Sequence, residues 1–230
     1  MNFVLERLTQ PEMEVVTLAE MKRHLRLFSS VTDEDADITA LIVAAREWVE
    51  DYTGRVLVDQ TWRLTLPGRP GSFAGGDIVG GTRDGTLPVG YGYYSGLWVW
   101  SSKGEIPLRK SPVIAITAFK SVDQAGTETT VDPATYQLRE PDSKWPRVVA
   151  LNSATWSSWL SGDLRITFRA GFADTVGSPG EGAEVVPVRF KQAMKLWAEA
   201  NYDRDEKLMP LLLEVAERLI KPECADLSLA

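Results

Sequence analysis

The spacing of apolar residues changes from helical to strand-like around Gly54, and this change restricts the possible folds more than any other feature. In TDEDADITALIVAAREWVEDYTG (residues 32–54), apolar residues recur every three to four positions, as on one face of an amphipathic helix. In RVLVDQTWRLTL (55–66) they alternate with polar residues, as in a strand with one buried face. Gly54 is placed to end the helix, since glycine readily adopts the left-handed conformation of a C-cap. A strong helix that runs into a strand predicts an α+β fold.

Helical patterns also lie near both ends of the chain. TLAEMKRHLRLF (17–28) begins with Thr17, three residues before Glu20, which is the spacing of a capping box. The apolar face expected for this helix consists of Leu18, Met21, Leu25 and Phe28. VPVRFKQAMKLWAEANYDR (186–204) and PLLLEVAERLIK, which starts at Pro210, predict two further helices. We expect the helices from the two ends of the chain to meet in space.

The middle of the chain carries strand patterns and one glycine-rich segment. EIPLRKSPVIAITAFKSVD and TTVDPATYQLRE flank a turn-like DQAGTE and predict a hairpin, while PRVVAL and GDLRITFRAGF predict two more strands. Residues 67–104 hold eleven of the eighteen glycines without sustained periodicity, which predicts a long loop. The expected organisation is a helical module from residues 1–55 and 185–222, a β-rich insertion over 56–184 and a flexible tail over 223–230.

Composition excludes several classes of site. Cys224 is the only cysteine and His24 the only histidine, so an intrachain disulfide and a thiolate metal cluster are excluded, and no cofactor is expected. The net charge of -7 disfavours binding to a phosphate backbone. No apolar run approaches the ~18 residues needed to cross a bilayer, and the N-terminus lacks the pattern of a signal peptide, which predicts a cytoplasmic product.

Two motifs that resemble ligand sites have simpler explanations. The glycines at 90, 92 and 96 miss the dinucleotide fingerprint by one residue and lead into LWVW rather than a helix. The acidic run over residues 33–37 lacks the glycine and distal glutamate of a calcium loop, and negative charge is favourable where a helix begins. Neither motif indicates a reaction.

The segment GYGYYSGLWVW (90–100) carries five aromatic rings among three glycines. A protein interface accounts for it well because Tyr and Trp are enriched at interface centres. Two alternatives remain: the rings cover the chain's own β layer, or they stack on a sugar or base. The partner-binding candidates here are Tyr93, Tyr94, Trp98 and Trp100.

The last predicted helix carries a second candidate surface. Its apolar stripe consists of Leu211, Leu212, Val215 and Leu219. A short helix is marginal alone and can dock into a partner's groove. The alternative, that the stripe closes the helical bundle internally, carries at least equal weight.

The order of several sequence blocks resembles the head–tail connector (adaptor) proteins of long-tailed phages and gene transfer agents. LAEMKRHLR matches the first block of that family, through Leu18, Lys22, His24, Leu25 and Arg26. The matching residues of the second block are Ile42, Ala45, Arg46, Glu50, Tyr52, Thr53, Gly54, Arg55, Gln60, Thr61 and Trp62. EIPLRKSPVIAITAFKSVDQAG, Tyr136, the WP at 145–146 and ITFRAGF…VPVRFKQAMKLWAEANYDRDE continue the resemblance across most of the chain.

The resemblance implies a structural protein without enzyme activity or obligatory cofactor. Such proteins form rings, commonly twelvefold, that sit below the portal protein and extend the DNA channel toward the stopper and tail. It therefore implies the portal protein, a stopper or tail-proximal neck protein and copies of the chain itself as partners. DNA would pass through without specific binding, and the protein would move from the cytoplasm into the particle neck. A stopper, a carbohydrate-binding module and an enzyme with an unrecognised site are the alternative functions.

Overall fold

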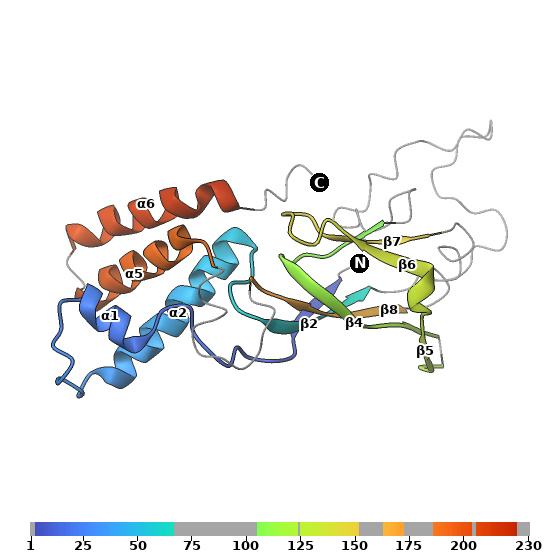
Figure 1. The fold of residues 1–230 in the computed structure, drawn as a ribbon, viewed down its shortest axis with the longest axis horizontal. Helices are drawn as coiled ribbons and strands as arrows, with labels where there is room; N and C mark the ends of the chain where they lie inside the picture. Colours follow the sequence, from blue (N-terminus) through green and yellow to red (C-terminus); the bar gives the residue numbers. More distant parts are fainter. Residues whose placement is uncertain are drawn as a thin grey trace.

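The structure, a computed structural model, describes residues 3–66, 105–123, 125–151, 163–172, 186–203 and 206–224. Within these ranges, four α-helices gather at one end of the molecule and two antiparallel sheets at the other (Figure 1). Helix and sheet are thus segregated, and the fold is α+β.

Helix α1 (Leu18–His24) begins as the sequence predicts but ends early. The Thr17 hydroxyl accepts the Glu20 backbone N–H at 3.2 Å, which caps the helix. Arg26 then adopts a φ of 59°, in the left-handed region, and the Leu27 N–H donates to the Lys22 carbonyl at 2.9 Å. This turn directs the chain away from the helix axis, and Phe28 is 79% exposed. The prediction that Phe28 belongs to the apolar face is therefore wrong.

Helix α2 (Asp35–Thr53) has the predicted extent and the predicted stop signal. Gly54 has a φ of 70°, and its N–H donates to the Glu50 carbonyl at 2.9 Å. The buried face of α2 includes Ile38, Ile42, Ala45 and Val49.

The C-terminal helices are α5 (Val188–Asp203) and α6 (Leu208–Ile220), followed by the 3-10 turn η2 (Lys221–Glu223). Helix α6 begins two residues before Pro210, so this proline lies in the first turn, where a backbone N–H has no partner within the helix. Helix α5 lies between α2 and α6 and packs against both (Figure 1). Helix α6 is therefore the outer helix of this layer.

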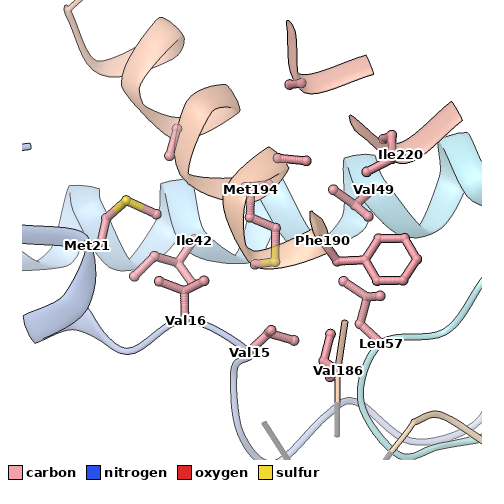
Figure 2. Packing of buried hydrophobic residues seen from close by; sticks show 14 of the residues in the cluster. Val15, Val16, Met21, Ile42, Val49, Leu57, Val186, Phe190, Met194 and Ile220 are labelled. Carbon is pink, nitrogen blue, oxygen red and sulfur yellow. The ribbon is translucent and has the colours of Figure 1, made fainter. Parts of the chain in front are cut away.

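Residues from both ends of the chain form one hydrophobic core among the helices. Figure 2 shows Phe190 and Met194 of α5 packed with Val49 of α2 and Ile220 of α6. The fully buried members of this core are Val15, Val16, Met21, Ile38, Ile42, Ala45, Val49, Leu57, Val58, Val186, Phe190, Ala193, Met194, Ala198, Ala216 and Ile220. Burial of an apolar side chain of this size contributes about 1.5–3 kcal/mol, so this core holds the two ends of the chain together.

A five-stranded sheet and a three-stranded sheet form the other half. The first has the order β1 (Val4–Arg7), β2 (Gln60–Leu66), β8 (Asp163–Ala170), β4 (Val113–Val122) and β5 (Glu128–Thr130). The second has the order β3 (Glu105–Pro107), β7 (Arg147–Ala150) and β6 (Tyr136–Arg139), with the 3-10 turn η1 (Pro133–Thr135) before β6. Strands β4 and β5 pair as an antiparallel hairpin, as the sequence predicts. Residues Tyr136–Arg139, which the sequence groups with the second arm of that hairpin, instead form β6 of the small sheet and pair with β7.

Two features of the sheets differ from the sequence prediction. Residues 4–7, which the sequence groups with the helices, form β1 and pair with β2, with Val4 opposite Thr65. Strand β2 begins only at Gln60, because residues 55–59 cross from the helical layer to the sheet without a strand partner beyond one bridge, from Arg55 to Ser111.

Both sheets contribute to a second core. Leu64, Phe119 and Phe168 come from the large sheet and Ile106 and Val148 from the small one. The two sheets thus pack face to face around a shared apolar interior.

Candidate functional site

The outer face of α6 presents a row of apolar side chains that are about half exposed. Leu208, Leu211 and Val215 follow the i, i+3, i+7 spacing of one helix face and are 51%, 59% and 46% exposed. We call these three residues the α6 outer stripe. Buried Ala216 and Ile220 lie on the opposite side, toward α5.

The structure separates the four α6 residues that the sequence groups together. Leu211 and Val215 lie on the outer stripe, whereas Leu219 packs against the helical core and Leu212 is half-buried. Leu208, which precedes the predicted helix, joins the stripe because α6 starts earlier than expected. The aromatic candidates Tyr93, Tyr94, Trp98 and Trp100 lie outside the described residues.

The second family-like block forms a buried polar junction between the helices and the large sheet. Arg46 of α2 is 1% exposed, and its Nε donates to Glu14 at 2.9 Å while its Nη1 donates to Glu50 at 2.8 Å. Glu14 comes from the segment between β1 and α1, and Arg7 of β1 pairs with Glu47 of α2 at 3.0 Å. We call Arg46, Glu14 and Glu50 the Arg46 junction.

Glu50 extends the junction to the start of β2. Its Oε1 accepts the Leu57 backbone N–H at 2.8 Å and the Gln60 side-chain amide at 2.9 Å. One carboxylate thus connects a helix, the crossing segment and a strand, with each of its oxygens hydrogen-bonded. Glu50 therefore fixes the start of β2 against helix α2.

Burial also affects the titration of the junction. The pKa of Glu14 is raised above its usual value, because the loss of hydration outweighs the attraction of Arg46, and the charges of Glu50 and Glu47 act in the same direction as burial. Glu14 and Arg46 form a close ion pair. The same Arg46 guanidinium also interacts with Glu47 and Glu50, so Glu14 does not have it alone.

The first family-like block attaches α1 to its neighbours. Lys22 is 6% exposed, donates to the Val31 carbonyl at 2.7 Å and forms an ion pair with Asp35 at the start of α2. His24 contacts Glu199 of α5 through its Nε2 at 3.0 Å. These contacts explain why a lysine and a histidine stand in this block, and neither is placed for catalysis.

Arg55, the last charged residue of the second block, has no comparable partner. It is 6% exposed, and its guanidinium carbon lies 5.1 Å from the centre of the Phe172 ring. Its Nε is buried without a hydrogen-bond partner. Burial lowers the pKa of Arg55, and the more distant Glu223 and Asp142 oppose this effect.

The functional residues that sequence reasoning misses are those of the Arg46 junction. The available signal is the Arg46–Glu50 spacing of four residues on the face of α2 that also carries Ile42 and Val49. Charged residues on an apolar helix face are buried only when paired. The partner Glu14 has no such signal because it comes from a distant segment.

Other kinds of site find no support in the described part of the chain. No group of three or more His, Cys, Asp or Glu side chains there is arranged to hold a metal ion. No helix in those ranges is long and apolar enough to cross a membrane. The exposed stripe on α6 is the feature of the described chain best suited to contact another protein.

Comparison with known proteins identifies a similar family and similar solved structures. Residues 15–73 match the family of phage gp6-like head-tail connector proteins. A chain in the neck of an empty gene transfer agent (GTA) particle, computed with C6 symmetry, is 27% identical with a TM-score of 0.63. A chain in the virion of a native GTA particle is 26% identical with a TM-score of 0.64. In both comparisons the match covers 94% of this chain and 94% of the other.

A third chain, from the neck of a native GTA particle computed with C12 symmetry, shares the fold at 24% identity and a TM-score of 0.60, with 94% of each chain covered. A search of curated proteins gives no match. The family match and the neck structures together support the resemblance of this chain to head–tail connector proteins of phage-like gene transfer agents. The matched proteins are structural components of particles, which supports a structural role in a particle neck.

Proposed function

We propose that this protein is the head–tail adaptor of a phage-like particle. Copies of the chain form a ring between the portal protein and a stopper or tail-proximal neck protein, and the ring extends the DNA channel. The protein assembles in the cytoplasm and then remains in the neck. The observation that carries the proposal is the likeness to neck chains over 94% of each chain, with the two cores and their connection included.

Ring formation is supported by the symmetry of the relatives and by the surface of this chain. The matched necks were computed with C6 and C12 symmetry, and we propose twelve copies here. A cyclic ring needs two different surfaces on each subunit that fit each other. In this proposal the two cores correspond to a helical adaptor module and a β-rich insertion.

The α6 outer stripe is the proposed docking surface for the portal protein. Leu211 and Val215 would bind the portal, together with Leu208, while Leu212 and Leu219 hold α6 against α5. This division of roles follows from exposure, since exposed apolar residues on an edge helix lose water contact only when a partner covers them.

The acidic net charge supports the passage of DNA without binding. Each Lys or Arg contact with a phosphate releases counterions and so adds affinity, which would slow DNA in a channel. In a chain with 32 acidic and 25 basic residues, acidic side chains outnumber the basic ones that could contact phosphates.

The proposal is tested with the double variant Leu211→Asp/Val215→Asp. Burying two carboxylates at an apolar interface is unfavourable, so we expect at least about a tenfold loss of portal binding, with rings and the thermal unfolding midpoint unchanged. The matched control is Val188→Asp, because Val188 on α5 is 68% exposed and equally apolar. Portal co-complexes are counted by native mass spectrometry.

Wild-type portal affinity in the double variant would contradict the docking proposal, and the absence of any ring in the wild type would contradict the adaptor proposal. Truncation before α6 is a weaker test. Ala216 and Ile220 belong to the helical core, so removal of α6 would open that core as well as remove the stripe.

A further inference from the structure

Arg55 lacks a partner within the described chain although it is almost fully buried. It follows the left-handed Gly54 at the end of α2, and Val56 beside it donates its N–H to the Ser111 carbonyl at 2.7 Å. No carboxylate oxygen of the described residues lies within 4.0 Å of its guanidinium. The Ser111 hydroxyl, on the residue bridged to Arg55, is also buried without a hydrogen-bond partner.

The position of Arg55 is fixed even though its charge is not satisfied. The ring of Phe172 lies tilted against Phe190 of the helical core, with 5.7 Å between ring centres, and contacts the guanidinium from one side. Gly171 holds Phe172 in place because its backbone lies against the 58–59 peptide. A guanidinium stays charged when buried and has five donors in a planar fork. A guanidinium that is held in place and has unpaired N–H donors is well suited to bind a hydrogen-bond acceptor.

The terminal nitrogens of Arg55 keep access to solvent. Among its guanidinium atoms, only Nε is buried without a partner. The other two nitrogens form no hydrogen bond within the described chain and are not completely buried. They are the donors that remain for a group from another chain.

Further cations surround the η2 turn next to Arg55. Lys144 donates to the carbonyl of Pro222, and Arg189 pairs with Glu223 at 2.8 Å. The carboxylates that influence Arg55 from a distance are Glu223 and Asp142, and Glu223 is already paired. In a chain with a net charge of -7, this turn has an excess of donors over acceptors.

We propose that Arg55 receives a carboxylate from the adjacent copy of this chain when the subunits assemble. A carboxylate fits because it accepts two parallel hydrogen bonds from a guanidinium fork. A polyanion such as DNA fits less well, because Glu223 and Asp142 repel its many charges more strongly than they repel a single carboxylate. In a cyclic ring each copy places a different surface against its neighbour, so a carboxylate on that surface of the adjacent copy is the proposed partner of Arg55. This inference rests on the proposed ring.

The first test compares Arg55→Met, Arg55→Lys and the matched control Arg189→Met. Arg189 lies at the same turn, but its side chain is 45% exposed and it has a carboxylate partner of its own. We expect Arg55→Met to unfold at the wild-type urea concentration or higher, since Met packs on Phe172 without a buried charge. Its assembly midpoint in sedimentation velocity should rise at least tenfold, with Arg55→Lys in between and Arg189→Met within twofold of the wild type.

Two outcomes of this test would overturn the inference. If Arg55→Met assembles at the wild-type concentration, the adjacent copy does not use Arg55. If Arg55→Met unfolds at a clearly lower urea concentration and Glu223→Gln does the same, Glu223 is its partner within the same chain.

The second test does not depend on ring formation. The Arg55 Nε–Hε NMR signal, assigned by its loss in Arg55→Met, is followed on adding sodium acetate or sodium chloride at equal ionic strength. We expect acetate to shift the signal and chloride to leave it in place. A signal that neither salt moves, or that moves only with a DNA oligonucleotide, would overturn the inference. A wild type that forms no ring but responds to acetate would instead count against the proposed function alone.

Discussion

Arg46 within α2 and Arg55 just beyond its C-cap are both almost completely buried, but their surroundings differ. Arg46 is 1% exposed and lies among three glutamates, two of which accept hydrogen bonds from it. Arg55 is 6% exposed and has an aromatic ring beneath it, with no carboxylate of the described chain in reach. The comparison shows that burial alone does not identify a structural charge. Arg46 is satisfied by its own chain, whereas the proposed partner of Arg55 belongs to another copy.

The largest expected effect is that of Arg46→Met. Removing the arginine leaves Glu14 and Glu50 close together and partly dehydrated, so the free energy of unfolding should fall by about 3–5 kcal/mol. Urea unfolding monitored by tryptophan fluorescence measures the loss. The double variant Arg46→Met/Glu50→Gln should lose less than the sum of the single variants, because it removes one of the stranded charges. A change below about 1 kcal/mol in the single variant would show that the Arg46 junction is not a stability determinant.

Gly171→Ala tests how closely the backbone next to Phe172 packs against residues 58–59. Gly171 has a φ of 150°, and an added Cβ would lie 2.6 Å from the Asp59 nitrogen and from the Val58 carbonyl carbon. Both are backbone atoms that cannot rotate away, so we expect a loss of about 2–3 kcal/mol in unfolding free energy. Gly126→Ala is the control, since Gly126 has a positive φ of 85° but nothing within 4 Å of the added Cβ. Equal losses in both variants would show that backbone strain, and not the contact with residues 58–59, is responsible.

The pH dependence of the Arg46 junction should be smaller and of a specific sign. Because the pKa of Glu14 is raised in the folded state, folding is favoured where this carboxyl is protonated. The stabilising contribution is complete below the unfolded-state pKa and is lost as pH rises through the folded-state value. The stability of the wild type relative to Glu14→Gln should therefore fall from mildly acidic pH toward neutrality. Urea unfolding of both proteins across this range measures it, and the opposite slope would mean that Arg46 outweighs burial at Glu14.

The smallest effect is expected for Arg218→Gln. Glu214 and Arg218 have the same four-residue spacing as Arg46 and Glu50, but their side chains are 55% and 76% exposed. An exposed pair of this kind contributes about 0.3–0.5 kcal/mol, so the unfolding midpoint should hardly move. A loss approaching that of Arg46→Met would show that spacing along the helix, and not burial, determines the strength of these pairs.

Local patterns predict much of this fold because they depend on neighbouring residues. The extent of α2, the cap by Thr17 and the stop at Gly54 follow from side chains within one helical turn of each other. The alternation in residues 60–66 likewise predicts the face of β2 that is buried, with Leu64 and Leu66 inside. The resemblance between the sequence blocks and the head–tail connector family is confirmed by the family match and by the neck structures.

The candidate site is less accessible to such patterns. The sequence places three leucines and one valine on one stripe of α6. Helix α5 covers one side of α6 and divides this set, which leaves Leu211 and Val215 outside. Phe28 fits the apolar period of α1 but lies beyond the turn at Arg26, which no hydrophobic pattern reports. The aromatic segment stays a prediction.

By itself, the sequence determined most of the helices and strands and the family that the chain resembles, because propensity, capping and periodicity act over a few residues. It missed β1 and the early end of α1. Only the tertiary structure decided that β1 joins β2 and β8, that Arg46 receives Glu14 and that Arg55 receives no carboxylate from the described chain. These outcomes depend on which distant segments share a space. Two arginines nine positions apart can be told apart only when their neighbours from elsewhere in the chain are known.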